Sequence, residues 1–249
     1  MRAVRAVLGA VAFLTRIPVG RLVEIDAADI TRGAPAFPLV GAAVGALVAG
    51  TAEGLGHILP SLAAAGIGLA AGAAVTGALH LDALADAADA LTKRGDAALA
   101  AMRDHAIGAY GATALVLDQL VKAAALAGLV VATGAVGPAV AAGALSRAVP
   151  FVVARALPTL RQDGAGASFS SGITLAGTLS ATAVAIGIAL LAGPRLGLEL
   201  TAVAGGIVVI AALFYGRWLG GVTGDLLGAA TEIAETTLLV AAAAIIGDR

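Results

Sequence analysis

Apolar residues run through this chain in long stretches, and the polar positions between them mark out segments long enough to cross a lipid bilayer. Each segment should be helical, because a backbone surrounded by lipid has to satisfy its own hydrogen bonds. The pattern therefore predicts an all-α fold, a polytopic transmembrane helix bundle of about seven spans within one integral membrane domain, residues 1–249. The spans are expected at residues 36–53, 61–80, 109–132, 138–157, 172–192, 199–218 and 226–246.

Composition agrees with a membrane protein. Hydrophobic residues make up 60% of the chain and charged residues 12%, about half the charged fraction of a soluble domain. The 34 glycines favour helices that pack closely through small residues. The chain has no cysteine, which excludes thiolate metal sites and a cysteine nucleophile. The net charge of −1 gives no field that would favour nucleic acid as a partner.

The first 20 residues resemble a signal peptide, with arginines ahead of an apolar run. Arg16 interrupts that run, however, and Pro18 follows without a small-x-small cleavage site. The apolar stretch is also short for a full span. An uncleaved helix lying in the membrane interface is therefore expected at the N-terminus.

Basic residues concentrate in three of the connections between spans. The intervening loops contribute only Arg195. By the positive-inside rule the basic connections face the cytoplasm, so the protein is expected in the plasma (inner) membrane with a cytoplasmic active site. The connections are residues 19–34, 81–108 and 158–171, and their basic residues include Arg21, Arg32, Lys93, Arg94, Arg103 and Arg161.

Three aspartates interrupt the apolar pattern in HLDALADAADAL, residues 80–91. At helical pitch Asp82, Asp86 and Asp89 fall at i, i+4 and i+7, on one face. Three like charges on one stripe repel each other unless a cation neutralises them, and a divalent metal is the expected one. The alternative is a solvated helix with ordinary ion pairs such as Asp89–Lys93.

Basic residues follow these acids in what we expect to be a cytoplasmic helical segment, residues 81–108. Carboxylates for a metal followed by basic groups suit a phosphate-bearing substrate, because Mg²⁺ bridges phosphate oxygens while Arg or Lys binds the remaining charge. His80 and His105 flank the acids without zinc-type spacing, so substrate contacts are expected of them. The substrate-binding candidates in this region are His80, Lys93, Arg94, Arg103 and His105.

A second acidic stripe, with Gly221 and Gly228, begins the last span. Asp225 at its mouth, or Asp104, is expected to complete the metal site, whereas Glu235 is as well explained by a structural hydrogen bond between helices. In another span Asp118 and Lys122 stand at i and i+4, where they could neutralise each other. The alternative is that Lys122 reaches the phosphate or the metal cluster.

Arg147 lies in the middle of an apolar segment, within SRAVP. A cation so placed is expensive in lipid and is expected to serve the substrate.

Six ordered motifs together resemble the cobalamin-5′-phosphate synthase family, also called the adenosylcobinamide-GDP ribazoletransferases. They extend from the N-terminal helix almost to the C-terminus, and their order makes the resemblance specific. The motifs are FLTRIP (13–18), FPLVGAAVG (37–45), HLDALADAADAL (80–91), MRDHAIGAYG (102–111), SRAVP (146–150) and GGVTGDLLGA (220–229).

The resemblance implies a membrane enzyme that joins adenosylcobinamide-GDP to α-ribazole, or to its 5′-phosphate, and releases GMP with the help of Mg²⁺. Asp82, Asp86 and Asp89 occupy the carboxylate positions of the family pattern, which is close to HLDGLADxxDG. Asp89 is the expected base, with Asp104 or His105 as alternatives. The chain has Asp-His-Ala-Ile-Gly at 104–108 where Asp-Ser-Arg-Ile-Gly is usual, so Arg103 or Arg94 is expected to replace the missing arginine.

Other interpretations stay open. DAADALTKR (86–94) is faintly similar to the opening motif of the CDP-alcohol phosphotransferases, which indicates related chemistry. A cation- or proton-coupled transporter could use the same acids, but transporter acids lie at the bilayer midplane. The basic residues beside the aspartates favour an enzyme. A purely structural subunit does not explain the aspartate face, and whether the protein forms a homo-oligomer is left open.

Overall fold

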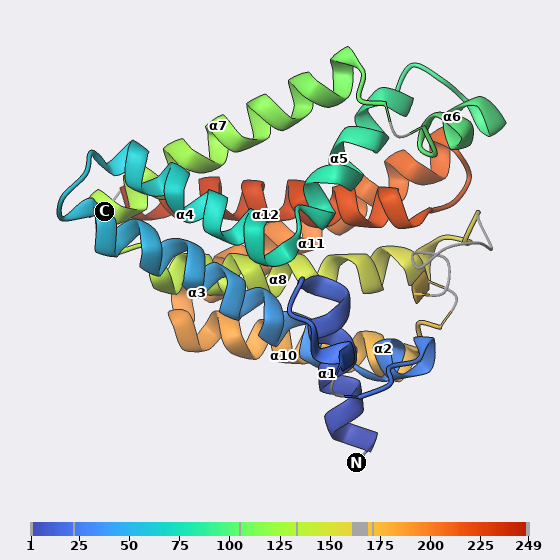
Figure 1. Ribbon diagram of the computed structural model, residues 1–249, viewed down its shortest axis with the longest axis horizontal. Helices are drawn as coiled ribbons and strands as arrows, with labels where there is room; N and C mark the ends of the chain where they lie inside the picture. The colour runs from blue at the N-terminus through green and yellow to red at the C-terminus, as the bar shows by residue number, and fades with distance from the viewer. Residues whose placement is uncertain are drawn as a thin grey trace.

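The computed structural model describes residues 2–21, 23–104, 106–132, 134–160, 169–170 and 172–247. Over these residues the long elements are all helices, and six are long and apolar enough to cross a membrane, or up to seven when one bent pair counts as a span. The predicted multi-pass helical bundle is therefore confirmed (Figure 1). The long helices are α3 (Ala36–Gly56), α4 (Ser61–Thr76), α5 (Leu79–Ala90), α7 (Ala109–Ala132), α8 (Val136–Ala156), α10 (Leu175–Ala192), α11 (Pro194–Trp218) and α12 (Gly224–Gly247).

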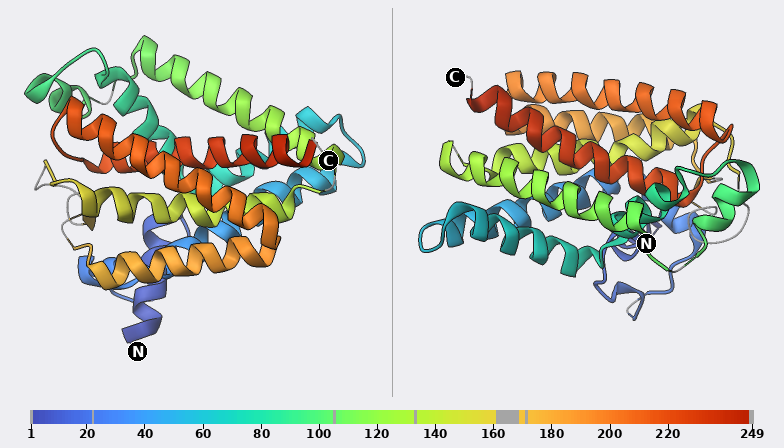
Figure 2. Two further views of the ribbon diagram at one scale, coloured as in Figure 1. Left: turned by 180° about the vertical axis from the view of Figure 1, so that it is seen from behind. Right: turned by 90° about the horizontal axis from the view of Figure 1, so that it is seen from above.

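Helix α8 lies at the centre of the bundle and contacts α3, α10, α11 and α12 (Figure 2). Small residues allow its closest approach to α3. A side chain on Gly41 would collide with the backbone of Gly143, and one on Gly45 with the backbone of Ala139. The glycine-rich sequence thus packs as expected, with backbones in direct contact.

The second span is not the continuous helix predicted for residues 61–80. Helix α4 ends at Thr76, and Gly77 and Ala78 both adopt left-handed backbone conformations, with φ of 65° and 58°. Glycine adopts this conformation without steric cost, and the following alanine completes the turn. The axis bends by 92° at this break. The aspartates therefore lie on a separate helix, α5, which leaves the direction of the span.

The N-terminal helix α1 (Arg2–Leu14) crosses the direction of the long helices instead of joining them (Figure 1). It buries Ala6, Gly9, Ala10 and Leu14 and contacts α2 (Ala27–Arg32) and α3. Helix α1 is not among the helices long and apolar enough to cross a membrane, and its position in the membrane interface stays a prediction.

A buried aspartate ties α1 to α2. Arg5 Nε donates to Asp29 at 3.0 Å, and Arg32 donates to the other carboxylate oxygen at 2.8 Å. Burial by itself raises the pKa of Asp29, but the backbone N–H of Asp26 and the two guanidinium charges hold that pKa below its ordinary value of 3.8. Asp29 is therefore an ionised clamp on the N-terminal segment.

Three connections meet at one end of the bundle, the end that carries α6 (Gly95–Ala101). The Trp218 indole donates to the carbonyl of Lys93 at 2.9 Å. The Val222 amide donates to the carbonyl of Pro158, also at 2.9 Å. Connections 91–104, 157–160 and 219–223 thus lie together, and the first two of these belong to basic connections that the charge pattern placed on one side of the membrane. Arg161, part of that argument, lies outside the described residues.

Candidate active site

A cavity of about 750 Å³, counting the space at its mouth, opens where α5, α8 and α12 meet the N-terminal segment. Its ionisable lining residues are Asp82 and His80 on α5, Arg147 on α8 and Asp225 on α12. All four residues were predicted from the sequence as site residues. The cavity thus gathers groups from positions 80 to 225, which the sequence left far apart.

Asp82 and Asp225 both stand in the first turn of their helices, where the helix dipole favours a negative charge. The two helices approach closely at Gly228, because a side chain there would collide with Ala83. Gly228 of the second acidic stripe thus admits helix α5, whereas Gly221 admits the segment at Pro158 and Leu160. The contact at Gly228 explains how carboxylates from α5 and α12 come to line the same cavity.

Asp82 and Asp225 could hold a metal ion together with the phosphates of a substrate. No group of three His, Asp or Glu side chains is arranged to hold a metal ion among the described residues. Mg²⁺ does not need such a cage, since it is often held by one or two carboxylates, by water and by the phosphates of its substrate. Asp82 and Asp225 are suited to a metal site that the substrate completes.

The other two aspartates of α5 stand on the same helix face, as predicted, but have different surroundings. Asp86 is half-buried. Both oxygens of Asp89 accept backbone hydrogen bonds, from the amide of Gly108 at 2.7 Å and from that of Gly111 at 2.8 Å. A side chain on either glycine would collide with the Asp89 carboxylate. Asp89 thus caps the start of α7, a contact that favours a positioning role over that of a base.

Arg147 is buried and lines the cavity from α8. It donates to the hydroxyl of Ser146 at 2.9 Å and forms an ion pair with Glu235. The Glu235 contact gives this acid a structural partner, which was one of its two predicted roles. A buried guanidinium held in this way presents its remaining donors without a large conformational cost.

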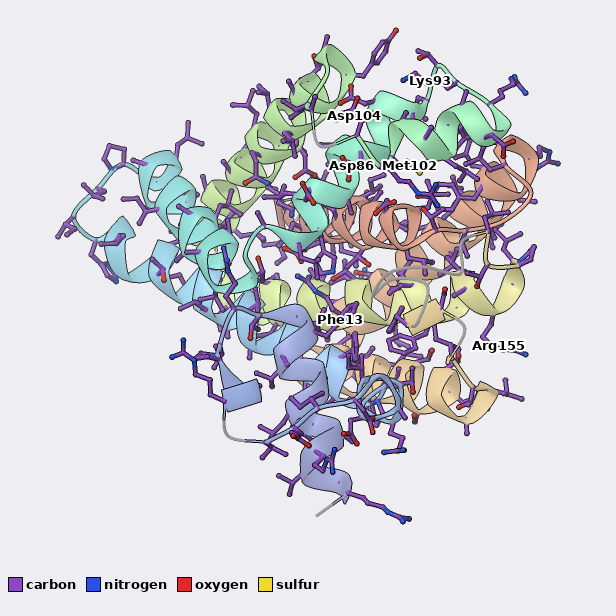
Figure 3. The ribbon with its side chains drawn as sticks, turned by 45° about the vertical axis from the view of Figure 1, so that its right-hand side comes forward. Phe13, Asp86, Lys93, Met102, Asp104 and Arg155 are labelled. Carbon is purple, nitrogen blue, oxygen red and sulfur yellow. The ribbon has the colours of Figure 1, made fainter. Side chains whose placement is uncertain are left out.

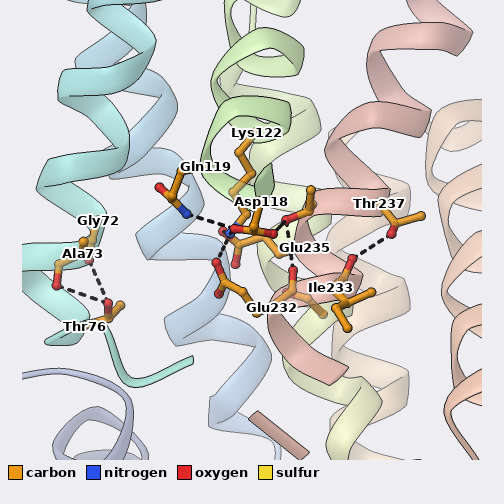
Figure 4. Close-up of polar contacts among 12 residues, drawn as sticks. Gly72, Ala73, Thr76, Asp118, Gln119, Lys122, Glu232, Ile233, Glu235 and Thr237 are labelled. Carbon is orange, nitrogen blue, oxygen red and sulfur yellow. Dashed lines mark hydrogen bonds and ion pairs between the residues drawn. The ribbon is translucent and has the colours of Figure 1, made fainter. Parts of the chain in front are cut away.

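Lys122 lies in a buried ion network between α7 and α12 (Figure 4). It pairs with Glu232, with Asp118 at 3.8 Å and with Glu235 at 3.5 Å. The predicted Asp118–Lys122 pair is therefore present. Lys122 lines a smaller cavity of about 380 Å³, and His80 and Arg147 line both cavities. His80 and Arg147 therefore lie between the two cavities, and Arg147 connects the active-site cavity to the ion network through Glu235.

Sequence reasoning missed the aromatic wall of the larger cavity. The chain has five phenylalanines, and four of them form one cluster with ring centroids 5.1–5.6 Å apart. Two features of the sequence could have indicated this wall. Aromatic residues are scarce in the chain, and two of the four phenylalanines begin the motifs FLTRIP and FPLVGAAVG. The cluster comprises Phe13, Phe37, Phe151 and Phe169, of which Phe13, Phe37 and Phe169 line the cavity.

The remaining predicted residues lie around α6, away from the aromatic wall (Figure 3). Lys93, Arg94, Arg103 and Asp104 are exposed, and the cavity lining contains none of them. Asp104 accepts the amide of Ala106 at 3.1 Å. His105 lies outside the described residues.

The fold and the cavity together define a multi-pass membrane protein whose site combines paired carboxylates, an imidazole and a guanidinium. These groups are suited to phosphate chemistry at the end of a helical bundle. The class is that of a membrane-bound transferase.

Comparison with known proteins specifies the family. Residues 6–243 match the family model described as Cobalamin-5-phosphate synthase. Adenosylcobinamide-GDP ribazoletransferase from Geotalea daltonii is 35% identical over 245 residues, covering 96% of each chain. The enzyme of the same name from Sinorhizobium medicae is 39% identical over 254 residues, covering 94% of each. The chain therefore belongs to this family of cobalamin-biosynthesis transferases. No solved structure is a significant match.

Proposed function

We propose that this chain joins adenosylcobinamide-GDP to α-ribazole, or to its 5′-phosphate, and releases GMP. One observation carries the proposal: Asp82, Asp225, His80 and Arg147 surround a single cavity in a chain whose relatives bear the name of this activity. The reaction forms a bond between the ribazole hydroxyl oxygen and the cobinamide-linked phosphorus. The phosphoanhydride bond to GMP breaks, and GMP leaves with the bridging oxygen.

Asp82 and Asp225 would hold Mg²⁺, with Asp86 on the same face of α5 next to them. The bound ion would neutralise charge on the diphosphate and on the departing GMP. Arg147 would bind phosphate oxygens from the opposite wall, where Glu235 and Ser146 fix its guanidinium. Lys122, which pairs with three acids outside this cavity, would stabilise the network that holds Arg147 and not contact the phosphate.

His80 is the group that we propose to accept the proton of the ribazole hydroxyl. It lines the cavity beside Asp82, and proton acceptance by an imidazole does not compete with metal binding by the two carboxylates. Asp89, the base expected from the sequence, has both oxygens engaged by amides of α7. Asp104 stays an alternative proton acceptor, and the pH–rate profile of His80→Gln distinguishes the two residues.

The aromatic wall would receive the planar base of the ribazole. Phe13, Phe37 and Phe169 offer ring faces and edges on the side of the cavity formed by the N-terminal segment. Aromatic surfaces of this kind bind flat heterocycles through stacking and apolar contact. The acids and Arg147 would then face the ribose of the ribazole and the diphosphate of the other substrate.

The site would face the cytoplasm, because the basic connections lie at the same end of the bundle as the cavity. Since the chain lacks cysteine, single cysteines can be introduced at Ala97 on α6 and at Gly56 at the opposite end. A membrane-impermeant maleimide added to intact cells should label the Gly56 site and not the Ala97 site. The reverse labelling would contradict the orientation.

The direct test of the activity uses purified protein in detergent with adenosylcobinamide-GDP, α-ribazole and Mg²⁺. GMP should appear in step with the cobalamin product, and omission of α-ribazole should stop it. Absence of GMP from folded protein, together with substrate-independent cation or proton flux in liposomes, would favour the transporter interpretation instead.

A further inference from the structure

A second groove, almost purely apolar, runs between α7 and α11 and is floored by α5 and α12. The right-hand view of Figure 2 shows α12 between the other two long helices. The groove encloses about 750 Å³, counting its open side. Its lining faces outward where the chain spans the membrane: Ile210 is 68% exposed and Phe214 46% exposed. This groove is distinct from the active-site cavity, with which it shares no lining residue.

The groove ends in an aromatic and basic rim. Trp218 closes it at the last residue of α11 and donates its indole N–H to the carbonyl of Lys93. Lys93 and Arg94 are exposed beside Leu91, which also lines the groove. Arg217 is exposed at the edge of the helix face formed by Ile210 and Phe214. Asp96, in the first turn of α6, follows Arg94 by two residues, and the three basic side chains outnumber this acid.

This combination defines the chemistry of its occupant. Tryptophan and basic residues occur together at the level of lipid headgroups, with the apolar surface beside them in the hydrocarbon layer. Basic side chains at this level attract anionic lipids. We propose that an anionic phospholipid occupies the groove, with an acyl chain between α7 and α11 and its phosphate at Lys93, Arg94 and Arg217. Lys93 and Arg94 would then serve the lipid and not the nucleotide.

The bound lipid would act on catalysis through α5. Asp82, Asp86 and Asp89 occupy one face of this helix, whereas Leu84, Ala87, Ala88 and Leu91 line the groove from the opposite face. An acyl chain packed there would hold α5 against α12 and would keep the acidic face in place. This consequence rests on the proposed function, but the binding of the lipid does not.

The test measures lipid retention without any substrate. The purified protein is exchanged into nanodiscs of phosphatidylcholine with or without phosphatidylglycerol, and retained lipid is counted by native mass spectrometry after release. The wild type should retain phosphatidylglycerol in preference to phosphatidylcholine. Each basic side chain near the headgroup is worth about a fivefold change in binding, so Arg217→Gln should lower the preference about 5-fold and Arg217→Gln with Lys93→Gln about 25-fold.

A matched control is Arg195→Gln, which removes one exposed arginine of α11 at the opposite end of the bundle. This variant should keep the wild-type preference. The proposal is overturned if the rim variants and the control retain phosphatidylglycerol equally. It is also overturned if added inorganic phosphate abolishes the preference for phosphatidylglycerol, because the site would then bind phosphate without the acyl chains. Activity assays then separate the two claims: lipid preference without GMP release contradicts only the proposed function.

Discussion

The carboxylate of Asp89 accepts the backbone N–H of Gly108 at 2.7 Å, across 19 positions of the sequence. This bond joins the end of the aspartate helix to the start of α7, and the Gly111 amide adds a second contact at 2.8 Å. A charge-assisted bond to a helix start stabilises both partners. The third aspartate of the motif therefore fixes the position of α5 and, with it, of Asp82.

Asp89→Asn should lower stability by about 1–2 kcal/mol, because one of the two amides loses its acceptor. Gly108→Ala should have a similar effect by pushing the Asp89 carboxylate away, since the atoms nearest to an added methyl group there all belong to this side chain. Thermal melting in detergent measures both variants. If both lower the melting temperature and activity together, Asp89 has a positioning role. If Asp89→Asn melts like the wild type but loses turnover, the residue acts in the chemistry instead.

Lys122→Met should be severely destabilising, by about 3–5 kcal/mol, because it leaves Glu232 and Asp118 buried beside each other without their shared cation. Adding Glu232→Gln should restore part of the loss by removing one buried charge. The measurement is the melting temperature of the single and double variants in the same detergent. A single variant as stable as the wild type would contradict the ion network.

Acid should weaken the N-terminal clamp. The pKa of Asp29 is held below its ordinary value, so its ionisation stabilises the fold fully above pH 3.8, and this contribution disappears as the pH falls through the lower, folded-state pKa. Asp29→Asn should therefore melt below the wild type at pH 6, and the difference should shrink as the pH falls below 3.8. A difference that stays constant with pH would show that the charge of Asp29 is not what holds α1 and α2 together.

His80→Gln should reduce turnover by about 10²–10⁴-fold while leaving Mg²⁺ dependence unchanged, because a proton acceptor is lost but no metal ligand is. The wild-type rate should fall at low pH as the imidazole takes up a proton, and the residual rate of the variant should lack this limb. The pH–rate profiles of both proteins provide the measurement. An unchanged limb in His80→Gln would assign the proton to Asp104 or to another acid.

Hydrophobic length and charge pattern were sufficient to predict the helical bundle, because the bilayer leaves a spanning backbone few alternatives. They could not predict the break at Gly77 and Ala78, since an alanine with positive φ has no local sequence signal. The helix predicted over 61–80 therefore ends early, at Thr76. The 92° bend between α4 and α5 could therefore not be predicted from the sequence.

Within the site, helical spacing placed the three aspartates on one face, and isolated charges in apolar segments pointed to Arg147 and Asp225. Spacing could not distinguish the aspartates from one another. Asp82 lines the cavity, whereas Asp89 contacts Gly108 and Gly111, which lie 19 and 22 positions further along the chain. The aromatic wall could not be predicted from the sequence either, because Phe13, Phe37 and Phe169 are far apart in the chain and meet only in the folded protein.

We propose that ribazole transfer takes place in the cavity lined by Asp82 and Asp225. The most direct measurement is the single-turnover rate of GMP release by Asp82→Asn and Asp225→Asn, compared with Glu199→Gln, an acid of α11 at the opposite end of the bundle. Both cavity variants should stay folded and lose about 100-fold or more in rate, with partial recovery at high Mg²⁺, and the control should react like the wild type. Wild-type rates in both cavity variants would show that the transfer takes place elsewhere.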